Sequence, residues 1–357
     1  LVMANLADGT YGDFKDYGAA YLQSKDAGSG PYTVETHRPG ELVRLTRFDD
    51  YALTPWNADA PGTIEFQITP EMATVATKLR AGEIDIGDWS LPPTVQNKIR
   101  QDSRFAFDTS PLPTAWFVIM NDVKPPLDDI WVRKAVASAY DTATVVNHIL
   151  GGGGPLAGPV PGTLLPGCEG ITTYDFDLEK AKEYLAQSKY SPEELAGFTM
   201  EVAAVAGSER FNNVALSLAM NLKKIGLPTE VKAVRWADIT QAQTKPETAY
   251  NFTVFYDAAK IPDPKLFLVY YTPGGWGAAY PPGGMYYENP EVTKLVEAGS
   301  QSNDPAVQQA SYCAAVKLIA EDSPSVFSHT DVRQTTYWNY VDAYGDGGGA
   351  QFYDLRF

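Results

Sequence analysis

Residues 124–150 constrain the fold more than any other part of the chain. Prolines at 125 and 126 and aspartates at 128 and 129 indicate an interruption followed by the capped start of a helix. Asp141 suits the N-cap of a second helix, and Gly151 begins the glycine run that ends it. Between the two caps, apolar residues recur with the i, i+3, i+4, i+7 spacing that buries one helix face, at Val132, Ala135, Val136 and Ala139. The segment therefore predicts two consecutive helices with an acidic lead-in.

The first third of the chain carries a mixture of strand and helix patterns. Residues 64–68 alternate as a half-buried strand, residues 72–79 carry a helical stripe closed by Gly82, and residues 84–86 alternate again. This order predicts a strand-helix-strand unit with a right-handed crossover. The continuous apolar run at 115–120 favours a central strand that is buried on both faces.

The later part of the chain repeats this alternation. Residues 198–202 and 231–233 alternate as strands around a long helical stripe at 211–225. A further strand is predicted at 252–256, and two helices are expected near 290–298 and 304–320. Strands that alternate with helices in this way predict the α/β fold class.

Six short motifs occur in an order that resembles one known family. Residues 28–32 resemble a Gly-Thr-Gly-Pro-Tyr turn, and residues 79–86 resemble a Leu-x-Ala-Gly-Glu-x-Asp element. Residues 116–121 resemble a strand that ends in asparagine ahead of the two prolines, and three further landmarks match at 38–41, 223–227 and 321–324. In this order the motifs resemble the family 5 extracellular solute-binding proteins, the oligopeptide and dipeptide receptors of ABC importers. Each motif alone is weak, whereas six in the right order are specific.

The resemblance implies a two-lobe fold like that of the periplasmic binding proteins (type II, cluster C), with hinge strands and a ligand-binding cleft between the lobes. We expect residues 1–125 to form the first lobe, residues 126–325 the second α/β lobe, and residues 326–357 a segment that returns to the first lobe. Relatives carry a substantial region before the Gly-Thr-Gly-Pro-Tyr turn, which here begins at Gly28. We therefore expect the chain to be a fragment whose first lobe is incomplete at its N-terminus.

The charge balance narrows the partners that can be expected. Lys and Arg number 28 against 44 Asp and Glu, for a net charge of −16, and this charge disfavours nucleic acids and anionic membranes. The resemblance implies a small-molecule or peptide ligand, an ABC permease as the membrane partner and no cofactor. It also implies a monomer in the periplasm or at the cell surface, with or without a lipid anchor on the complete protein.

The ligand-binding motif of the family departs from its usual pattern here. Peptide-binding relatives carry Trp-x-x-Asp-x-x-Asp/Glu-Pro, in which the first aspartate holds the ammonium group of the peptide. Residues 257–264 match at Asp263 but place Asp257 at the tryptophan position and Lys260 at the ammonium-binding position. A lysine that faces the cleft would favour an anionic or oxygen-rich ligand, whereas a pair between Asp257 and Lys260 would be purely structural. A sugar-containing, opine-like or anionic solute therefore competes with the peptide that is usual for the family.

Two further cations and three tryptophans are candidate ligand contacts. Lys245 matches a position that is basic in some relatives, with a solvated loop lysine as the alternative. Arg210 opens a helix, where it would contact an anion or lie on the surface beside a cap. Trp276, in a glycine-rich loop, and Trp89, just past a predicted strand, could stack on sugars or grip side chains. Trp116 lies on the predicted central strand, where core packing is the alternative.

The sequence offers little support for an enzyme. Three histidines occur without a helical His-x-x-x-His pair, and neither a Gly-x-Ser-x-Gly motif nor a phosphate-binding loop is present. We therefore expect no catalytic residue and no metal site. The alternative is a carbohydrate-active hydrolase that uses two carboxylates, drawn from Asp85, Asp88, Asp257 and Asp263.

Cys168 and Cys313 are the only cysteines in the sequence. They are far apart in the chain, and no Cys-x-x-Cys pair points to zinc or redox chemistry. Cys313 falls on a predicted helix, where a buried free thiol is the ordinary outcome. We favour two structural thiols, while a single disulfide stays open.

Overall fold

The computed structural model describes residues 4–9, 12–23, 25–52, 56, 59–87, 91, 93–111, 113–259, 261–275 and 285–341. The chain divides into two compact units, the first made of residues 1–110 and 334–357 and the second of residues 111–333. Both division points fall within strands that pair with each other, β4 (Phe105–Pro111) and β11 (Val332–Trp338). The expected lobe borders were residues 125/126 and 325/326, which differ from these division points. The reason is that β5 (Thr114–Met120) and β10 (Ser325–Thr330) both belong to the sheet of the second unit.

A six-stranded mixed sheet forms the centre of the second unit. Its strand order is β6-β10-β5-β9-β7-β8. β7 runs parallel to both β8 and β9, while β5 runs antiparallel to β9 and to β10. The predicted strand-helix-strand unit is therefore present as β7, α8 (Glu209–Lys224) and β8. The other bounds are β6 (Gly154–Pro155), β7 (Met200–Val205), β8 (Thr229–Val234) and β9 (Phe252–Ala258).

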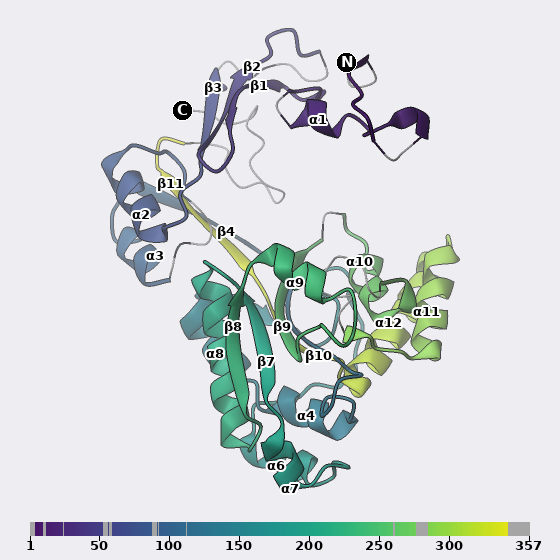
Figure 1. The fold of residues 1–357 in the computed structure, drawn as a ribbon. Coiled ribbons are helices and arrows are strands. Elements are labelled where there is room, and N and C mark those ends of the chain that lie inside the picture. Colours follow the sequence, from purple (N-terminus) through teal and green to yellow (C-terminus); the bar gives the residue numbers. More distant parts are fainter. Residues whose placement is uncertain are drawn as a thin grey trace. The chain divides into compact units, whose positions relative to one another are not determined.

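Helices cover both faces of this sheet, and β5 contributes to the core on each side (Figure 1). Every residue of β5 is buried, as its apolar run predicts. Trp116, Val118 and Met120 join one core cluster, while Ala115, Phe117 and Ile119 join the other. The first cluster packs against α4 (Ile130–Ser138), α6 (Leu178–Leu185), α7 (Pro192–Gly197) and α8, and the second against α10 (Lys265–Leu268), α11 (Pro290–Gln301) and α12 (Pro305–Asp322). Burial of each large apolar side chain contributes about 1.5–3 kcal/mol.

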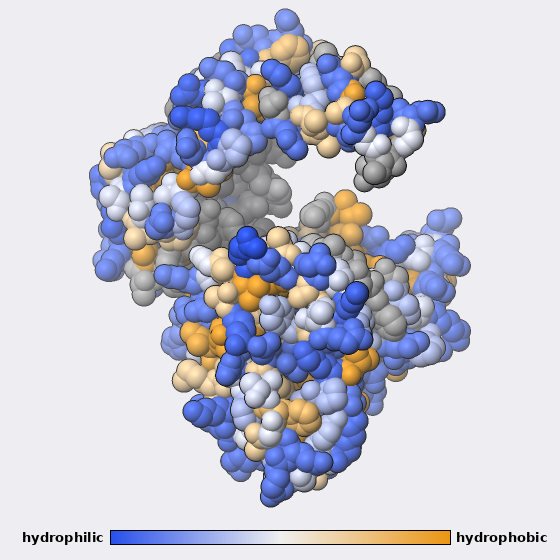
Figure 2. All heavy atoms as spheres, viewed as in Figure 1, coloured by the Kyte–Doolittle hydropathy of each residue, from blue (hydrophilic) through white to orange (hydrophobic). Residues whose placement is uncertain are grey.

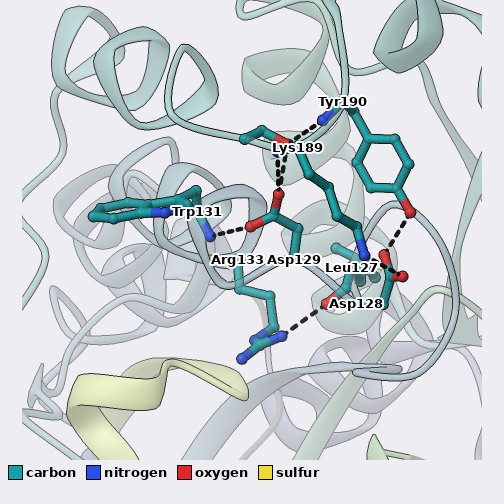
Figure 3. A network of polar contacts seen from close by, with 8 residues as sticks. Leu127, Asp128, Asp129, Trp131, Arg133, Lys189 and Tyr190 are labelled. Carbon is teal, nitrogen blue, oxygen red and sulfur yellow. Dashed lines mark hydrogen bonds and ion pairs between the residues drawn. The ribbon is translucent and has the colours of Figure 1, made fainter.

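The acidic lead-in of the sequence holds the start of α4 in place. The Asp129 carboxylate caps α4 by accepting a hydrogen bond from the Trp131 backbone N–H at 2.9 Å. Its other oxygen accepts from the Lys189 backbone N–H at 2.7 Å, and Asp128 accepts from the Lys189 ammonium and the Tyr190 hydroxyl, both at 2.7 Å (Figure 3). The two aspartates thus tie the beginning of α4 to the turn between α6 and α7.

The second predicted cap is also present. Asp141 accepts a hydrogen bond from the Thr144 N–H at 2.9 Å at the start of α5 (Thr142–Thr144). α5 continues into a π-helix, η3 (Val145–Leu150), which ends at Gly151 with φ of 80°. Glycine adopts this left-handed conformation without the strain that a side chain would cause. The remaining helical segments described in the second unit are α9 (Trp236–Ala242), η4 (Val269–Tyr271) and η5 (Pro273–Gly275).

The first unit combines an antiparallel sheet with a small helical core. Its sheet has the order β1-β2-β3, with β1 (Tyr32–Arg38), β2 (Leu42–Arg47) and β3 (Thr63–Gln67). Leu79 of α2 (Met72–Ala81) is fully buried in the helical core, and α2 ends at Gly82 as predicted. The other helical segments described are η2 (Gly12–Phe14), α1 (Ala19–Leu22) and α3 (Pro93–Ile99).

The predicted strand at residues 84–86 is wrong. Ile86 forms a single isolated bridge with Tyr337 on β11, and Ile84 packs against the small helical core of the first unit. Two alternating apolar residues are too few to define a strand when each finds a different partner. The strand-helix-strand crossover expected around α2 is therefore absent among the described residues.

The expectation of two free thiols is also wrong. Cys168 and Cys313 form a disulfide, with their Cα atoms 5.5 Å apart. Cys313 lies on α12, and both cysteines border the second core cluster. Folding brings them together across 145 residues of sequence, so local helical spacing around Cys313 could not reveal the partner.

Among the helices that the structure describes, none is long and apolar enough to cross a bilayer. On the face drawn in Figure 2, hydrophilic residues predominate and hydrophobic residues form small, separate patches.

Candidate functional site

The strands of the second unit bring several polar and aromatic side chains to one edge of the sheet. The parallel strands β7, β8 and β9 all end there. β5 starts at the same edge, because its first residue, Thr114, pairs with Ala258 at the end of β9. β10 ends at this edge, because His329 pairs with Trp116 near the start of β5. In open α/β sheets, ligands bind beyond the carboxyl ends of the parallel strands. We call this region, with residues 114–116, 206–210, 234–236, 256–258 and 329–331, the carboxyl edge.

A buried ion pair lies at the centre of the carboxyl edge. Arg210, in the first turn of α8, donates from Nη2 to Oδ1 of Asp331 at 3.0 Å. Trp116 donates from Nε1 to the other oxygen of the same carboxylate at 2.8 Å. The Asp331 side chain is only 1% exposed and that of Arg210 is 16% exposed. Arg210 also lies over the Trp116 ring, 5.4 Å from its centroid, which adds a cation–π contact.

Burial controls the ionisation of this group. It raises the pKa of Asp331, while Arg210 and the hydrogen bond from Trp116 act in the opposite direction. Burial also lowers the pKa of His329 to about 3, with a smaller contribution from the charge of Arg210. The His329 imidazole is therefore neutral at pH 7, and the buried group of Arg210, Asp331 and His329 contains one ion pair instead of an excess of positive charge.

His329 connects the ion pair to a short chain of hydroxyl groups. Its ring stacks on Trp116 with a centroid distance of 5.4 Å. Its Nδ1 lies 2.8 Å from the Ser328 hydroxyl, which in turn lies 2.7 Å from the Tyr140 hydroxyl. On the other side, Nε2 lies 3.8 Å from Oδ1 of Asp331. These contacts hold the imidazole in one orientation within the carboxyl edge.

The more accessible part of the carboxyl edge is formed by aromatic rings and one carboxylate. Trp236 begins α9, is 39% exposed, and stacks on the buried Phe255 at 6.2 Å. Phe255 also makes an edge-on contact with Tyr270 at 6.3 Å. The Tyr270 hydroxyl donates a hydrogen bond to Asp257, which is partly exposed. An exposed indole face and a partly exposed carboxylate at the same edge of a sheet can contact both apolar and polar parts of a small ligand.

The predicted ligand contacts fall into three groups. Trp116, Arg210 and Asp257 lie at the carboxyl edge. Arg210 forms the buried ion pair with Asp331, and the buried Trp116 donates a hydrogen bond to that pair. Lys245 is exposed on the loop after α9. Lys260, Trp276 and Trp89 lie outside the described residues.

The carboxylates considered for a hydrolase have structural partners where they are described. Asp85 accepts a hydrogen bond from the Tyr340 hydroxyl, and Asp263 accepts one from the Lys265 backbone N–H at 2.8 Å. Asp88 lies outside the described residues. Among the described residues, no group of three or more His, Cys, Asp and Glu side chains could hold a metal ion.

Sequence reasoning missed three residues of the carboxyl edge. Asp331 and His329 fall in a segment that was expected only to return to the first lobe, and neither belongs to a recognisable motif. Their importance depends on partners more than 100 residues away, Trp116 and Arg210. Trp236 carried a usable signal, because a tryptophan directly after a predicted strand in an α/β pattern falls at the end of the sheet where ligands bind.

Residues 2–279 match the family model described as bacterial extracellular solute-binding proteins, family 5, middle region. Among curated relatives, the "Probable D,D-dipeptide-binding periplasmic protein DdpA" of Escherichia coli K12 is 25% identical over 313 residues, which cover 87% of this chain and 58% of DdpA. The chain thus spans less than two thirds of that relative.

Solved structures share the fold. The oligopeptide-binding protein AppA from Bacillus subtilis, in complex with a nonapeptide, matches with a TM-score of 0.80 and 19% identity, covering 92% of this chain and 66% of AppA. AgaA from A. tumefaciens R10, in complex with agropinic acid, matches with a TM-score of 0.75 and 21% identity, covering 95% of this chain and 68% of AgaA. The predicted fold of the two-lobe periplasmic binding proteins is confirmed.

Proposed function

The chain belongs to family 5 of the bacterial extracellular solute-binding proteins, and we propose that it captures a small polar solute outside the cytoplasm and delivers it to an ABC permease. The observation that carries this proposal is the family match over residues 2–279, supported by the shared fold. The complete protein would act as a monomeric receptor in the periplasm or at the cell surface. Binding would leave the ligand chemically unchanged.

We assign the contribution of the second unit to ligand binding to the carboxyl edge. Trp236 offers an exposed aromatic face, and the Asp257–Tyr270 pair offers polar groups at the same edge of the sheet. The buried Arg210–Asp331 pair fixes Trp116 and the first turn of α8 at the same edge of the sheet. Preformed rigid contacts reduce the entropy that is lost when a ligand binds.

The ligand class we propose is a peptide or another small polar solute with anionic or oxygen-rich groups. DdpA is named for D,D-dipeptides, AppA is solved with a nonapeptide and AgaA with agropinic acid, so one fold serves chemically different ligands. In this chain, Lys260 replaces the aspartate that holds a peptide ammonium group in relatives. A cation at that position favours ligands with carboxylate, phosphate or sugar oxygens.

A ligand panel tests the proposed function. Di- and tripeptides, opines and acidic sugars would be added to the purified protein, and the melting temperature and calorimetric binding would be recorded. A solute-binding protein is stabilised by its ligand, and the ligand is recovered intact by mass spectrometry. Release of a cleaved product would instead support the hydrolase alternative, and no stabilisation by any panel member would count against the proposal.

A further inference from the structure

A second polar cluster lies within the second unit at the end of β5 that is remote from the carboxyl edge. It consists of Asp122, two residues after β5, Arg133 on α4, and Asp322, the last residue of α12. The Asp122 side chain is 7% exposed and the Arg133 side chain 10% exposed. The Asp122 carboxyl group and the Arg133 guanidinium are therefore largely withdrawn from water, with the partly buried Asp322 next to them.

The Arg133 guanidinium directs its best hydrogen bonds at carbonyl groups. Nη1 donates to the Leu127 carbonyl at 2.9 Å (Figure 3), and Nη2 donates to the Asp322 backbone carbonyl at 3.1 Å. Its Nε donates to the same Asp322 carbonyl at 3.4 Å and reaches Oδ1 of Asp122 only at 3.7 Å. The cation is thus near Asp122 without donating a hydrogen bond to it.

The carboxyl groups of Asp322 and Asp122 differ in their hydrogen-bond partners. The Asp322 carboxylate accepts hydrogen bonds from the Tyr287 hydroxyl at 2.6 Å and from the Asn289 amide at 2.8 Å. Both side-chain oxygens of Asp122 lack a hydrogen-bond partner among the described residues. A buried ionised carboxylate without hydrogen bonds is costly, and such a group reduces the cost by becoming neutral.

We propose that Asp122 is a proton-binding site, so that its side chain is a neutral carboxylic acid in the folded protein at neutral pH. With Asp122 neutral, Arg133 keeps its hydrogen bonds to the Leu127 and Asp322 backbone carbonyls, and the Asp322 carboxylate keeps its own two donors. The proposal does not depend on the proposed function, because the cluster lies apart from the carboxyl edge. It makes folding of this protein a proton-coupled process.

The surroundings of Asp122 support this protonation. Burial raises the pKa of Asp122 well above its usual value; Arg133 opposes the rise and the Asp322 carboxylate adds to it. The other titratable groups that sense Asp122 are the hydroxyls of Tyr271 on η4 and Tyr287, and burial raises the pKa of both. Both tyrosines are therefore neutral, and Arg133 is the one cation facing Asp122 among the described residues.

The direction of the resulting pH dependence follows from linkage. The folded protein holds this proton more tightly than the unfolded chain, whose aspartates titrate near a pKa of about 3.9. Above that pH, the folding equilibrium constant falls by up to roughly tenfold per pH unit until the folded protein also releases the proton. Asp122 therefore stabilises the fold most in acid and becomes a cost as the pH rises through its folded pKa.

Infrared spectroscopy at neutral pH tests the proposal directly. The wild-type protein should show the C=O stretching band of one protonated carboxylic acid, and Asp122→Asn should lose it. Because asparagine has the shape of the neutral acid, this variant should fold at least as stably as wild type at neutral pH, with a flatter pH dependence. Asp322→Asn is the matched control in the same cluster, and it should keep the band.

Three results would overturn the proposal: no such band in the wild type, a band that persists in Asp122→Asn, or a band lost only in Asp322→Asn. If Asp122→Asn fails to fold, the wild-type protein with ¹³C-labelled aspartate carboxyl groups still decides the matter. One buried aspartate signal should keep the chemical shift of the protonated acid at neutral pH. Aspartate signals that are all ionised there would contradict the assignment.

Discussion

The Trp116 indole donates a hydrogen bond of 2.8 Å to the Asp331 carboxylate across 215 residues of sequence. Trp116 lies near the start of β5, and Asp331 lies between β10 and β11. Since Arg210 binds the other oxygen of the same carboxylate, one aspartate joins two strands and a helix. This single group organises the buried side of the carboxyl edge.

Removing that carboxylate should destabilise the second unit strongly. Asp331→Ala removes the buried carboxylate that the Arg210 guanidinium binds, and breaking a buried pair in this way costs about 3–5 kcal/mol. Urea denaturation at pH 7 measures the loss. Asp238→Ala, which breaks the exposed Arg235–Asp238 pair on α9, is the control and should stay close to wild type. Equal effects of the two variants would contradict the assigned role of Asp331.

Replacement of His329 should change how stability depends on pH. Its pKa is lowered to about 3 in the folded protein. Between this value and the pKa of the unfolded chain, the imidazole is protonated in the unfolded chain but neutral in the folded protein. His329 therefore lowers the free energy of unfolding as the pH falls from about 6.5 towards about 3, by up to about 1.4 kcal/mol per pH unit.

The comparison of wild type with His329→Asn in urea between pH 7 and pH 4 isolates this contribution. The variant should be less stable at pH 7, because it loses the stack on Trp116, but its stability should fall less steeply in acid. His37→Asn, which changes an exposed histidine of β1, is the control and should have the wild-type slope. Parallel curves for wild type and His329→Asn would refute the prediction.

Removing the disulfide should weaken the second unit. The Cys168–Cys313 bridge closes a loop of 145 residues, and in the chain-entropy model such a loop stabilises the fold by about 4–5 kcal/mol. The Cys168→Ser/Cys313→Ser double variant should show this loss in denaturation experiments, and reduction of the wild type should have a similar effect. A wild type that unfolds identically with and without reductant would contradict it.

An added methyl group at Gly299 should disturb the packing of α11 on α12. A Cβ atom there would overlap the ring of Tyr312, and overpacking of this kind costs about 1–3 kcal/mol. Gly299→Ala should therefore lower the melting temperature, and Tyr312→Leu in the same chain should restore part of it. Gly197→Ala, where the Cβ would meet open space, is the control. A Gly299→Ala protein as stable as the control would show that the ring moves aside freely.

Ligand affinity should depend on Lys260. If this lysine contacts an anionic ligand, Lys260→Ala should weaken calorimetric binding by at least tenfold, because a charge-assisted hydrogen bond is lost. The melting temperature without ligand should hardly change. Lys223→Ala, near the end of α8 and exposed, removes a positive charge elsewhere and should leave the affinity unchanged. An affinity that survives Lys260→Ala would end this hypothesis.

The parts of the fold that were predictable depend on local signals. The caps at Asp129 and Asp141, the helix end at Gly151 and the buried strand β5 were all visible in spacing and residue type. Each of these features is decided by neighbours within a few residues, so the sequence alone carries the information.

The parts that were not predictable depend on partners that folding brings together. The Cys168–Cys313 disulfide and the hydrogen bond between Trp116 and Asp331 join residues more than 100 positions apart. Arg210 was expected to contact a ligand or lie on the surface, but its partner is a buried carboxylate that no motif marks. Ile86 failed as a strand residue because its one bridge partner lies on β11, near the other end of the chain.

The alternation of β5 between two cores has a consequence for folding. A slip of this strand by one residue against β9 or β10 would exchange the side chains on its two faces. Trp116 would then enter the core layer that holds Phe117, and the packing of both helical layers would be disrupted at once. A wrong register of β5 would therefore remove native contacts in both layers, not in one alone. We expect the two layers of the second unit to lose their native structure in a single cooperative transition, with no stage at which one persists without the other.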